Sequence, residues 1–132
     1  MANEVITYYS KNPPNKFEMT DYTVKNAEDN RNCSDTMEVF LKIEDWKVKD
    51  WSFVWVTSIV TTACASVFWE SIIWMSLEEV LTKKYDYILE LVWEEISPRR
   101  QKWAVFGLVA TKNAIHKYLN DWIVEDILSN LP

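Results

Sequence analysis

The chain has 132 residues, a formal net charge of −6 at pH 7 and a composition that is 48% hydrophobic. This length predicts a single domain, residues 1–132, that buries one core. The negative charge and the lack of a basic stripe exclude nucleic acid as an expected partner. Only one residue is glycine, which disfavours a turn-rich β fold or a phosphate-cradling loop and favours a helical protein.

The residues that carry chemistry form no recognisable constellation. Cys33 and Cys64 lie in unlike surroundings, no CxxC pair occurs, and His116 is the only histidine. Glu78 and Glu79 are adjacent on a predicted helix and point in different directions, which excludes a paired acid and base. We therefore expect no enzyme activity, no catalytic residue, no metal site and no cofactor. Two reduced thiols predict an intracellular protein.

The first 35 residues are polar and are interrupted at Pro13-Pro14. Two prolines remove two amide donors, so a first short helix must end before them. Asp35 followed by Glu38 matches the pairing of a helix N-cap with the third helical residue. This pattern predicts a short helix that carries Met37, Phe40 and Leu41 on one side.

Residues 51–69 contain no charged side chain. Their number is close to the roughly 20 apolar residues that span a membrane, and the flanking Trp side chains resemble interfacial anchors. Six Ser and Thr residues dilute the segment, so we favour a buried helix with small residues for close packing. The β-branched content also permits two short strands.

The second half of the chain has helical periodicity. Apolar residues from Leu77 to Ile96 recur at three- and four-residue spacing, which predicts an amphipathic helix of about six turns. Ser97-Pro98 predicts a new start, because Ser caps helices and Pro is tolerated in the first turn. We expect this helix to reach Asn120 and a short closing helix to end at Pro132.

Several segments resemble motifs of the Bcl-2 family, in the order in which that family has them. The run Val67-Phe68-Trp69-Glu70-Ser71-Ile72-Ile73-Trp74 resembles the first homology segment. Four further segments resemble the family's N-terminal helix, its own BH3 segment, the join of its central helices and the approach to its second homology segment: residues 3–11, 22–29, 95–98 and 118–123.

This resemblance implies an all-α fold: a Bcl-2-like helical bundle of about 7–8 helices around a central hydrophobic hairpin, without a C-terminal membrane anchor. Family members hold a BH3 helix in a hydrophobic groove. The family's Gly-Arg after the Trp is replaced by Met75-Ser76, and losing a charge-assisted bond predicts weaker or narrower ligand choice. Carried over by position, the groove comprises Phe40, Leu41, Val67, Phe68, Ile73, Trp74, Ser76, Leu77 and Glu78.

Three functional hypotheses follow. The resemblance implies a viral, iridovirus-type inhibitor of apoptosis that sequesters Bim-like BH3 proteins in the host cytoplasm or at mitochondria. The second hypothesis is a helical virus–host adaptor that binds another host protein through an external aromatic helix face, because the many aromatic residues exceed what one core hides. The third is a membrane protein anchored by residues 51–69. Self-association into a homodimer would cover an open groove.

Overall fold

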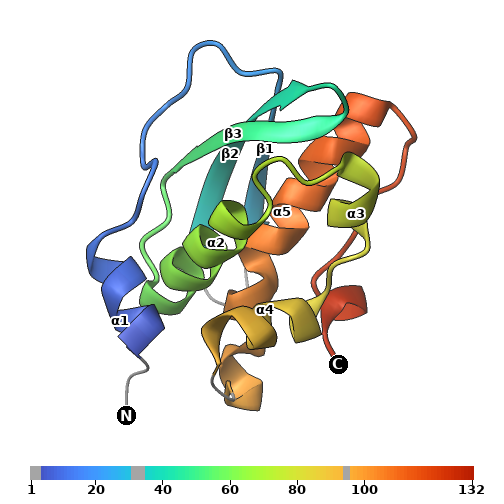
Figure 1. Ribbon diagram of the computed structural model, residues 1–132. Helices are drawn as coiled ribbons and strands as arrows, with labels where there is room; N and C mark the ends of the chain where they lie inside the picture. Colours follow the sequence, from blue (N-terminus) through green and yellow to red (C-terminus); the bar gives the residue numbers. More distant parts are fainter. Residues whose placement is uncertain (1–3, 31–34, 94–95) are drawn as a thin grey trace.

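The computed structural model describes residues 4–30, 35–93 and 96–132 and shows a mixed α/β fold (Figure 1). Three strands form one antiparallel sheet in the order β1-β2-β3: β1 (Val24–Asn30), β2 (Asp35–Glu44) and β3 (Lys47–Val54). The sheet is thus a meander of consecutive strands. The connection from β2 to β3 is a two-residue turn, Asp45-Trp46.

Helices pack against one side of this sheet (Figure 1). The two long helices, α2 (Ile59–Ser71) and α5 (Gln101–Leu119), contact each other, and α5 also contacts β1 and β2. The remaining helical elements pack around this pair: α1 (Glu4–Lys11), α3 (Leu77–Leu81), α4 (Tyr85–Val92) and the 3-10 turns η1 (Pro98–Arg100) and η2 (Leu128–Asn130).

The side chains of β2 alternate between two environments, because successive residues of a strand point to opposite faces. Met37, Val39 and Leu41 are buried in the main core together with residues of α2 and α5. Phe40 lies on the other face, where its ring centroid is 5.6 Å from that of Tyr22. The segment before β1 therefore covers the second face of the sheet.

An aromatic cluster joins β3 to α2. The ring centroid of Trp69 lies 4.7 Å from that of Trp51 and 4.8 Å from that of Phe53. Trp69 is buried, and its indole Nε1–H donates to the Thr111 hydroxyl at 2.6 Å, so the polar end of the ring is satisfied. Thr111 in turn donates to the Gly107 carbonyl at 2.8 Å. This chain of contacts fixes α2 against α5.

Gly107 allows α2 and α5 to approach closely, since a Cβ there would lie 2.4 Å from the Cβ of Ala65. We expect Gly107→Ala to lower the free energy of unfolding by about 1–3 kcal/mol, because the helices must move apart in a packed core. This holds although alanine has a helix propensity better by roughly 1 kcal/mol. Urea denaturation measures the change, with the exposed Lys117→Ala as control. A Gly107→Ala protein with unchanged stability would contradict the close approach.

The all-α prediction is wrong, because residues 24–54 form the sheet. The predicted short helix that carries Met37, Phe40 and Leu41 is strand β2. The alternation of Met37, Val39 and Leu41 has the period of a strand, but Phe40 between them, buried on the opposite face, conceals it. The Bcl-2-like bundle around a central hairpin is excluded with it.

Other predicted elements are confirmed in part. The first helix ends before Pro13, and α5 ends at Asn120, whose left-handed conformation caps it. Residues 51–69 divide into the end of β3 and helix α2, and no helix among the described residues is long and apolar enough to cross a membrane. The described residues of the range 77–96 contain two helices, α3 and α4, and only η2 forms within the expected closing helix.

Five positions used in the sequence interpretation lie outside the described residues: Asn3, Asn32, Cys33, Glu94 and Glu95.

Candidate functional site

The start of β2 meets the start of α2 at a buried carboxylate. Asp35 is 3% exposed; its Oδ1 accepts from the Thr57 amide at 3.2 Å and its Oδ2 from the Ser58 amide at 3.1 Å. Ser58 caps α2, accepting from the Thr61 amide at 3.4 Å. We call Asp35, Thr57 and Ser58 the β2–α2 junction. A carboxylate is favourable here, because the N-terminus of a helix carries partial positive charge.

Asp35 Oδ1 has further partners within the chain. Oδ1 of Asp35 also accepts from the Thr36 amide at 3.0 Å and from the Thr57 hydroxyl at 3.4 Å. Both carboxylate oxygens are therefore engaged by groups of the chain itself. Asp35 thus positions two elements against each other through both of its carboxylate oxygens.

We expect Asp35→Ala to lower the free energy of unfolding by about 1–3 kcal/mol, because the amides of Thr57 and Ser58 lose their acceptor in a buried setting. Chemical denaturation measures this. The matched control is Glu90→Ala, which removes an exposed carboxylate and should change stability by no more than about 0.5 kcal/mol. Equal effects of the two substitutions would show that Asp35 does not hold the junction together.

Of the two cysteines, the structure describes Cys64. Cys64 is buried in α2, and burial raises its pKa to about 12, so its thiol stays protonated. A protonated thiol is neither a nucleophile nor a metal ligand. Cys33 lies outside the described residues, two positions before Asp35 in the chain. Any thiolate chemistry of this protein therefore depends on Cys33.

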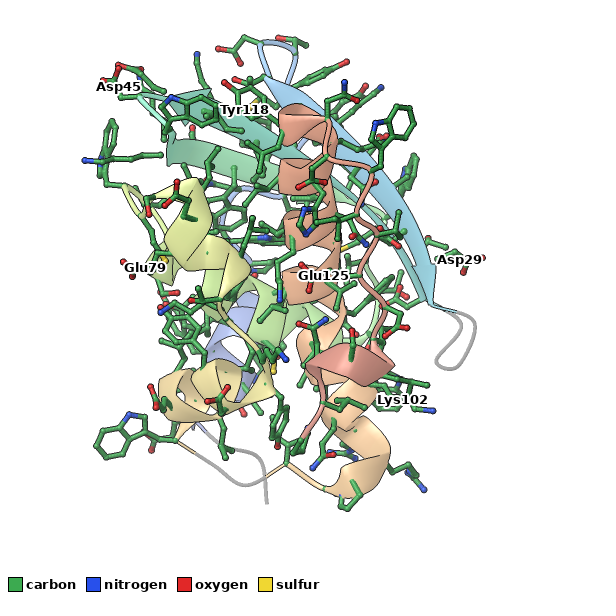
Figure 2. All side chains as sticks on the ribbon, turned by 90° about the vertical axis from the view of Figure 1, so that its right-hand side faces the viewer. Asp29, Asp45, Glu79, Lys102, Tyr118 and Glu125 are labelled. Carbon is green, nitrogen blue, oxygen red and sulfur yellow. The ribbon has the colours of Figure 1, made fainter. Side chains whose placement is uncertain are left out.

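A second polar cluster fastens the C-terminal segment to α5 (Figure 2). The ammonium group of Lys112, only 1% exposed, lies 2.7 Å from Glu125 Oε1 and donates to Asn130 Oδ1 at 2.7 Å. The ring nitrogens of His116 lie 2.8 Å from Asp121 Oδ2 and from Glu125 Oε2. We call these five residues the C-terminal clamp. The imidazole of His116 thus bridges the carboxyl groups of Asp121 and Glu125, and Lys112 adds an ion pair with Glu125 to the same cluster.

The clamp makes stability depend on pH. Burial opposes ionisation of Glu125 and is the largest single influence on it, but hydrogen bonds from Lys112 and His116 outweigh it, so the pKa of Glu125 is lowered. The pKa of Asp121 is also lowered, first by the Ile123 amide and then by His116. A lowered folded-state pKa gives stabilisation that is complete above the unfolded pKa and is lost as the pH falls through the folded one.

We therefore expect the free energy of unfolding to decline as the pH drops below about 4, the ordinary range of carboxyl groups. Urea titrations from pH 7 to pH 3 measure this decline. Glu125→Gln should make the free energy of unfolding decline less at acidic pH, because it removes a titrating carboxyl whose pKa is lowered. Identical pH profiles for the two proteins would contradict the role of the clamp.

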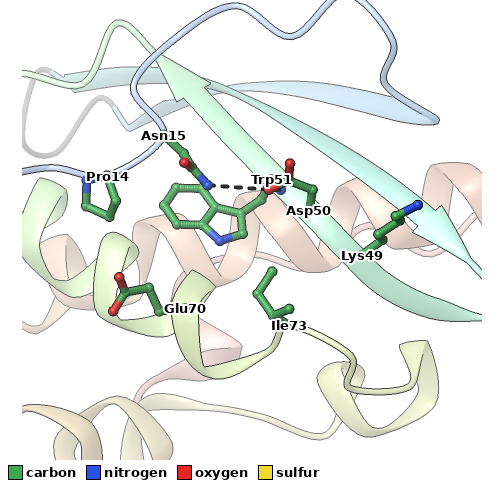
Figure 3. A pocket seen from close by; sticks show the side chains of 7 residues that line it. All are labelled: Pro14, Asn15, Lys49, Asp50, Trp51, Glu70 and Ile73. Carbon is green, nitrogen blue, oxygen red and sulfur yellow. Dashed lines mark hydrogen bonds between the residues drawn. The ribbon is translucent and has the colours of Figure 1, made fainter.

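A shallow pocket of about 510 Å³ lies between the segment before β1, strand β3 and the end of α2 (Figure 3). Its floor contains the buried Trp51, and Asn15 donates across it to Asp50 at 3.4 Å. It has neither a thiol nor an imidazole. The full lining is Pro14, Asn15, Lys49, Asp50, Trp51, Glu70 and Ile73.

The residues assigned by resemblance to a BH3 groove are spread over three elements and one loop. Phe40 and Leu41 lie on opposite faces of β2. Trp74 is 55% exposed in the loop between α2 and α3, and Ser76 caps α3 by accepting from the Glu79 amide at 3.2 Å. Val67 and Phe68 are buried in α2, and Leu77 is buried in α3. Ile73 lines the pocket described above, and Glu78 lies exposed on α3.

The comparison with known families decides the relationship. Residues 1–123 match the model of the NifU-like N terminal domain. The chain belongs to this family. The NifU-like domain is also 32% identical, over 82 residues, to the iron-sulfur cluster assembly scaffold protein IscU of Thermotoga maritima. That match covers 62% of the chain and 58% of the relative, so the chain spans less than two thirds of the relative's length.

Solved structures share the fold of this NifU-like domain. A candidate iron–sulfur cluster assembly scaffold protein of the SUF system from Fervidobacterium islandicum superposes with a TM-score of 0.76 at 17% identity, over 86% of the chain and 96% of that protein. The N-terminal part of a nitrogen-fixing NifU-like protein from Brucella abortus superposes with a TM-score of 0.74 at 15% identity, over 90% and 94%. At these identities the likeness shows the fold alone.

These findings overturn the Bcl-2 assignment. The chain is a NifU-like domain, so the predicted apoptosis inhibitor, the helical virus–host adaptor and the BH3 partner are wrong. The expected setting in the cytoplasm or mitochondria of a virus-infected host is also wrong, because the relatives are bacterial proteins. The segment 67–74 that resembled a homology motif is the end of α2 and the start of a loop.

Sequence reasoning missed the two polar clusters. Asp35 was recognised as a cap but assigned to the wrong helix, since the helix that it supports starts more than twenty residues later. The clamp had a readable signal: Lys112 and His116 lie one turn apart on one helix face, and Asp121 and Glu125 follow within nine residues of His116.

Proposed function

We propose that this NifU-like domain takes part in the assembly of iron–sulfur clusters as a scaffold and does not act as an enzyme. The observation that carries the proposal is the family match over residues 1–123. The relative from T. maritima, an iron-sulfur cluster assembly scaffold protein, supports it, and so does the shared fold. On this proposal the cluster is cargo, which the protein receives and releases.

The cysteines of the chain limit how a cluster is held. Iron–sulfur clusters are bound mainly by Cys thiolates, with four in the common two-iron and four-iron types. The chain has two cysteines, and the thiol of Cys64 is sealed in the core as a neutral group. Cys33 is the remaining cysteine and therefore the candidate thiolate ligand. No group of three His, Cys, Asp or Glu side chains suited to a metal ion occurs within residues 4–30, 35–93 and 96–132.

One chain therefore contributes one thiolate, from Cys33. A second copy of the chain contributes another, and small thiols from solution complete the ligand set. Asp35 acts indirectly, by fixing the start of β2 two residues beyond Cys33 and tying it to α2. The cluster is therefore easily passed on, because half of its ligands are small thiols that are readily replaced.

The test is anaerobic incubation of the purified protein with ferric iron, sulfide and glutathione, followed by desalting. We expect visible cluster absorption and about one iron per chain, which is half the content of a two-iron cluster held by each chain alone. Cys33→Ala should abolish retention of iron and sulfide, and Cys64→Ala should leave it intact. Failure of the wild-type protein to retain iron, or full retention by Cys33→Ala, would refute the proposal.

A further inference from the structure

Positive φ angles occur at eight non-glycine residues among those that the structure describes. Three of them are Asn15, Asp45 and Asn120, residue types that tolerate the left-handed region. The other five are all tryptophan, and none of the positive-φ positions is glycine: Trp46, Trp55, Trp74, Trp93 and Trp122. A bulky side chain in this region is a genuine outlier, so five of one type require an explanation.

Two of these positions belong to motifs that are normally completed by glycine. Asp45 and Trp46 form the two-residue turn of the β2–β3 hairpin, with φ values of 54° and 61°. Positive φ at both residues defines the type I′ turn, for which Asp-Gly is among the preferred pairs. Trp93 follows α4 with φ 58° and ψ 29°, and its amide donates to the Leu89 carbonyl. This is the left-handed helix cap, where glycine is the usual residue.

The other three positions also lie where a strand or helix ends. Trp55 directly follows β3, and Trp74 lies in the loop after α2, with its amide donating to the Val48 carbonyl at 2.7 Å. Trp122 follows the cap of α5 by two residues. In each case the backbone conformation is the one that glycine adopts without steric cost.

Burial divides the eight tryptophans in the same way as the backbone does. All five positive-φ tryptophans are exposed, by 55% for Trp74 and up to 90% for Trp93. Trp51 and Trp69 are buried in the aromatic cluster and Trp103 is half-buried, and none of these three has positive φ. The tryptophans thus fall into two classes. Three have the buried or half-buried environment that is usual for tryptophan, and five have the exposed, positive-φ environment that is usual for a turn glycine.

The composition agrees with this division. Glycine averages about 7% of residues in soluble proteins, or roughly nine in a chain of this length, whereas this chain has one. Counting the five exposed positions as glycine raises the glycines from one to six and lowers the tryptophans from eight to three.

We infer that positions 46, 55, 74, 93 and 122 are glycine in the protein that the source cell makes. The codon at these positions is translated as tryptophan in the printed sequence, whereas the source cell translates it as glycine. UGG is the ordinary tryptophan codon, and UGA is a stop codon that some genomes reassign. If both UGA and UGG are translated as tryptophan in the printed sequence, the UGA positions form the exposed class with positive φ and the UGG positions form the other class. The five exposed rings are then absent from the native surface and anchor no partner.

The gene and the native protein test this inference directly. We expect UGA at the five exposed positions and UGG at Trp51, Trp69 and Trp103. Trypsin digestion of the protein from its source cell gives peptides 85–99 and 118–132, each with one exposed position. Both should have the mass of the glycine form, and peptide 103–112 should retain Trp103 as an internal control. UGG at all eight positions, or tryptophan in either of the first two native peptides, overturns the inference.

Discussion

Replacing Lys112 by methionine is expected to lower the free energy of unfolding by about 3 kcal/mol, the lower end of what breaking a buried ion pair costs. The Lys112 ammonium group uses its three donors on Glu125 Oε1, Asn130 Oδ1 and the Lys83 carbonyl, at 2.7, 2.7 and 2.8 Å. Methionine fills a similar volume but leaves these three acceptors without that donor. The effect is moderated because Glu125 keeps its contact with His116.

Chemical denaturation measures the loss, and amide hydrogen exchange in residues 121–131 shows where the protein loosens. Lys117→Met is the matched control, because Lys117 is an exposed lysine of the same helix, and it should change stability by no more than about 0.5 kcal/mol. Combining Lys112→Met with Glu125→Gln should cost less than the sum of the single changes, because the two residues are coupled. Additive effects, or faster exchange elsewhere only, would show that the clamp does not hold this segment.

The sequence predicts the helical parts of this fold better than the sheet. The helical region from Pro98 to the cap of α5 at Asn120 was predicted because Pro and Asn act locally, although Ser97 makes no side-chain capping hydrogen bond and the first turn is the 3-10 turn η1. The sheet was missed for a physical reason. The β2–β3 turn depends on residues that accept positive φ, and the sequence has tryptophan there, at position 46, where a glycine would have signalled the turn.

The candidate site was predictable only in fragments. Asp35 was identified as a cap, but its partners Thr57 and Ser58 are more than twenty residues away, and a single sequence does not reveal pairing over that distance. The inertness of Cys64 follows from its burial between packed elements, which is a property of the folded chain. The apolar run around Cys64 agrees with this burial.

The Bcl-2 resemblance shows how degenerate motifs mislead. Each motif was degenerate and matched at only a few positions, and a few matches at short spacing occur in many folds. The first of them depended on Trp74, whose exposed ring and positive φ mark it as part of a loop. Its apparent role as the centre of a groove came from the residue type alone.

Trp93→Gly is expected to raise the free energy of unfolding by about 1 kcal/mol. The left-handed conformation costs a residue with a side chain about 1–2 kcal/mol, and the greater freedom of glycine in the unfolded chain offsets part of the gain. Trp93 suits this test because its ring is 90% exposed and no side-chain contact of it is among the hydrogen bonds and ring pairs that the structure describes. For a chain of this length the gain corresponds to roughly 3–5 °C in the unfolding midpoint.

The matched variant Trp93→Ala separates the backbone from the ring, because alanine also removes the ring but keeps a Cβ. Glycine should therefore stabilise more than alanine. Replacing all five exposed tryptophans by glycine should add less than five times the gain at position 93, because the ring of Trp46 also contacts that of Tyr118, with 5.8 Å between the centroids. Trp69→Gly should instead cost about 3–5 kcal/mol, because it empties the core. If Trp93→Ala stabilises as much as Trp93→Gly, the backbone at position 93 does not favour glycine, and the division of the tryptophans into two classes loses its energetic basis.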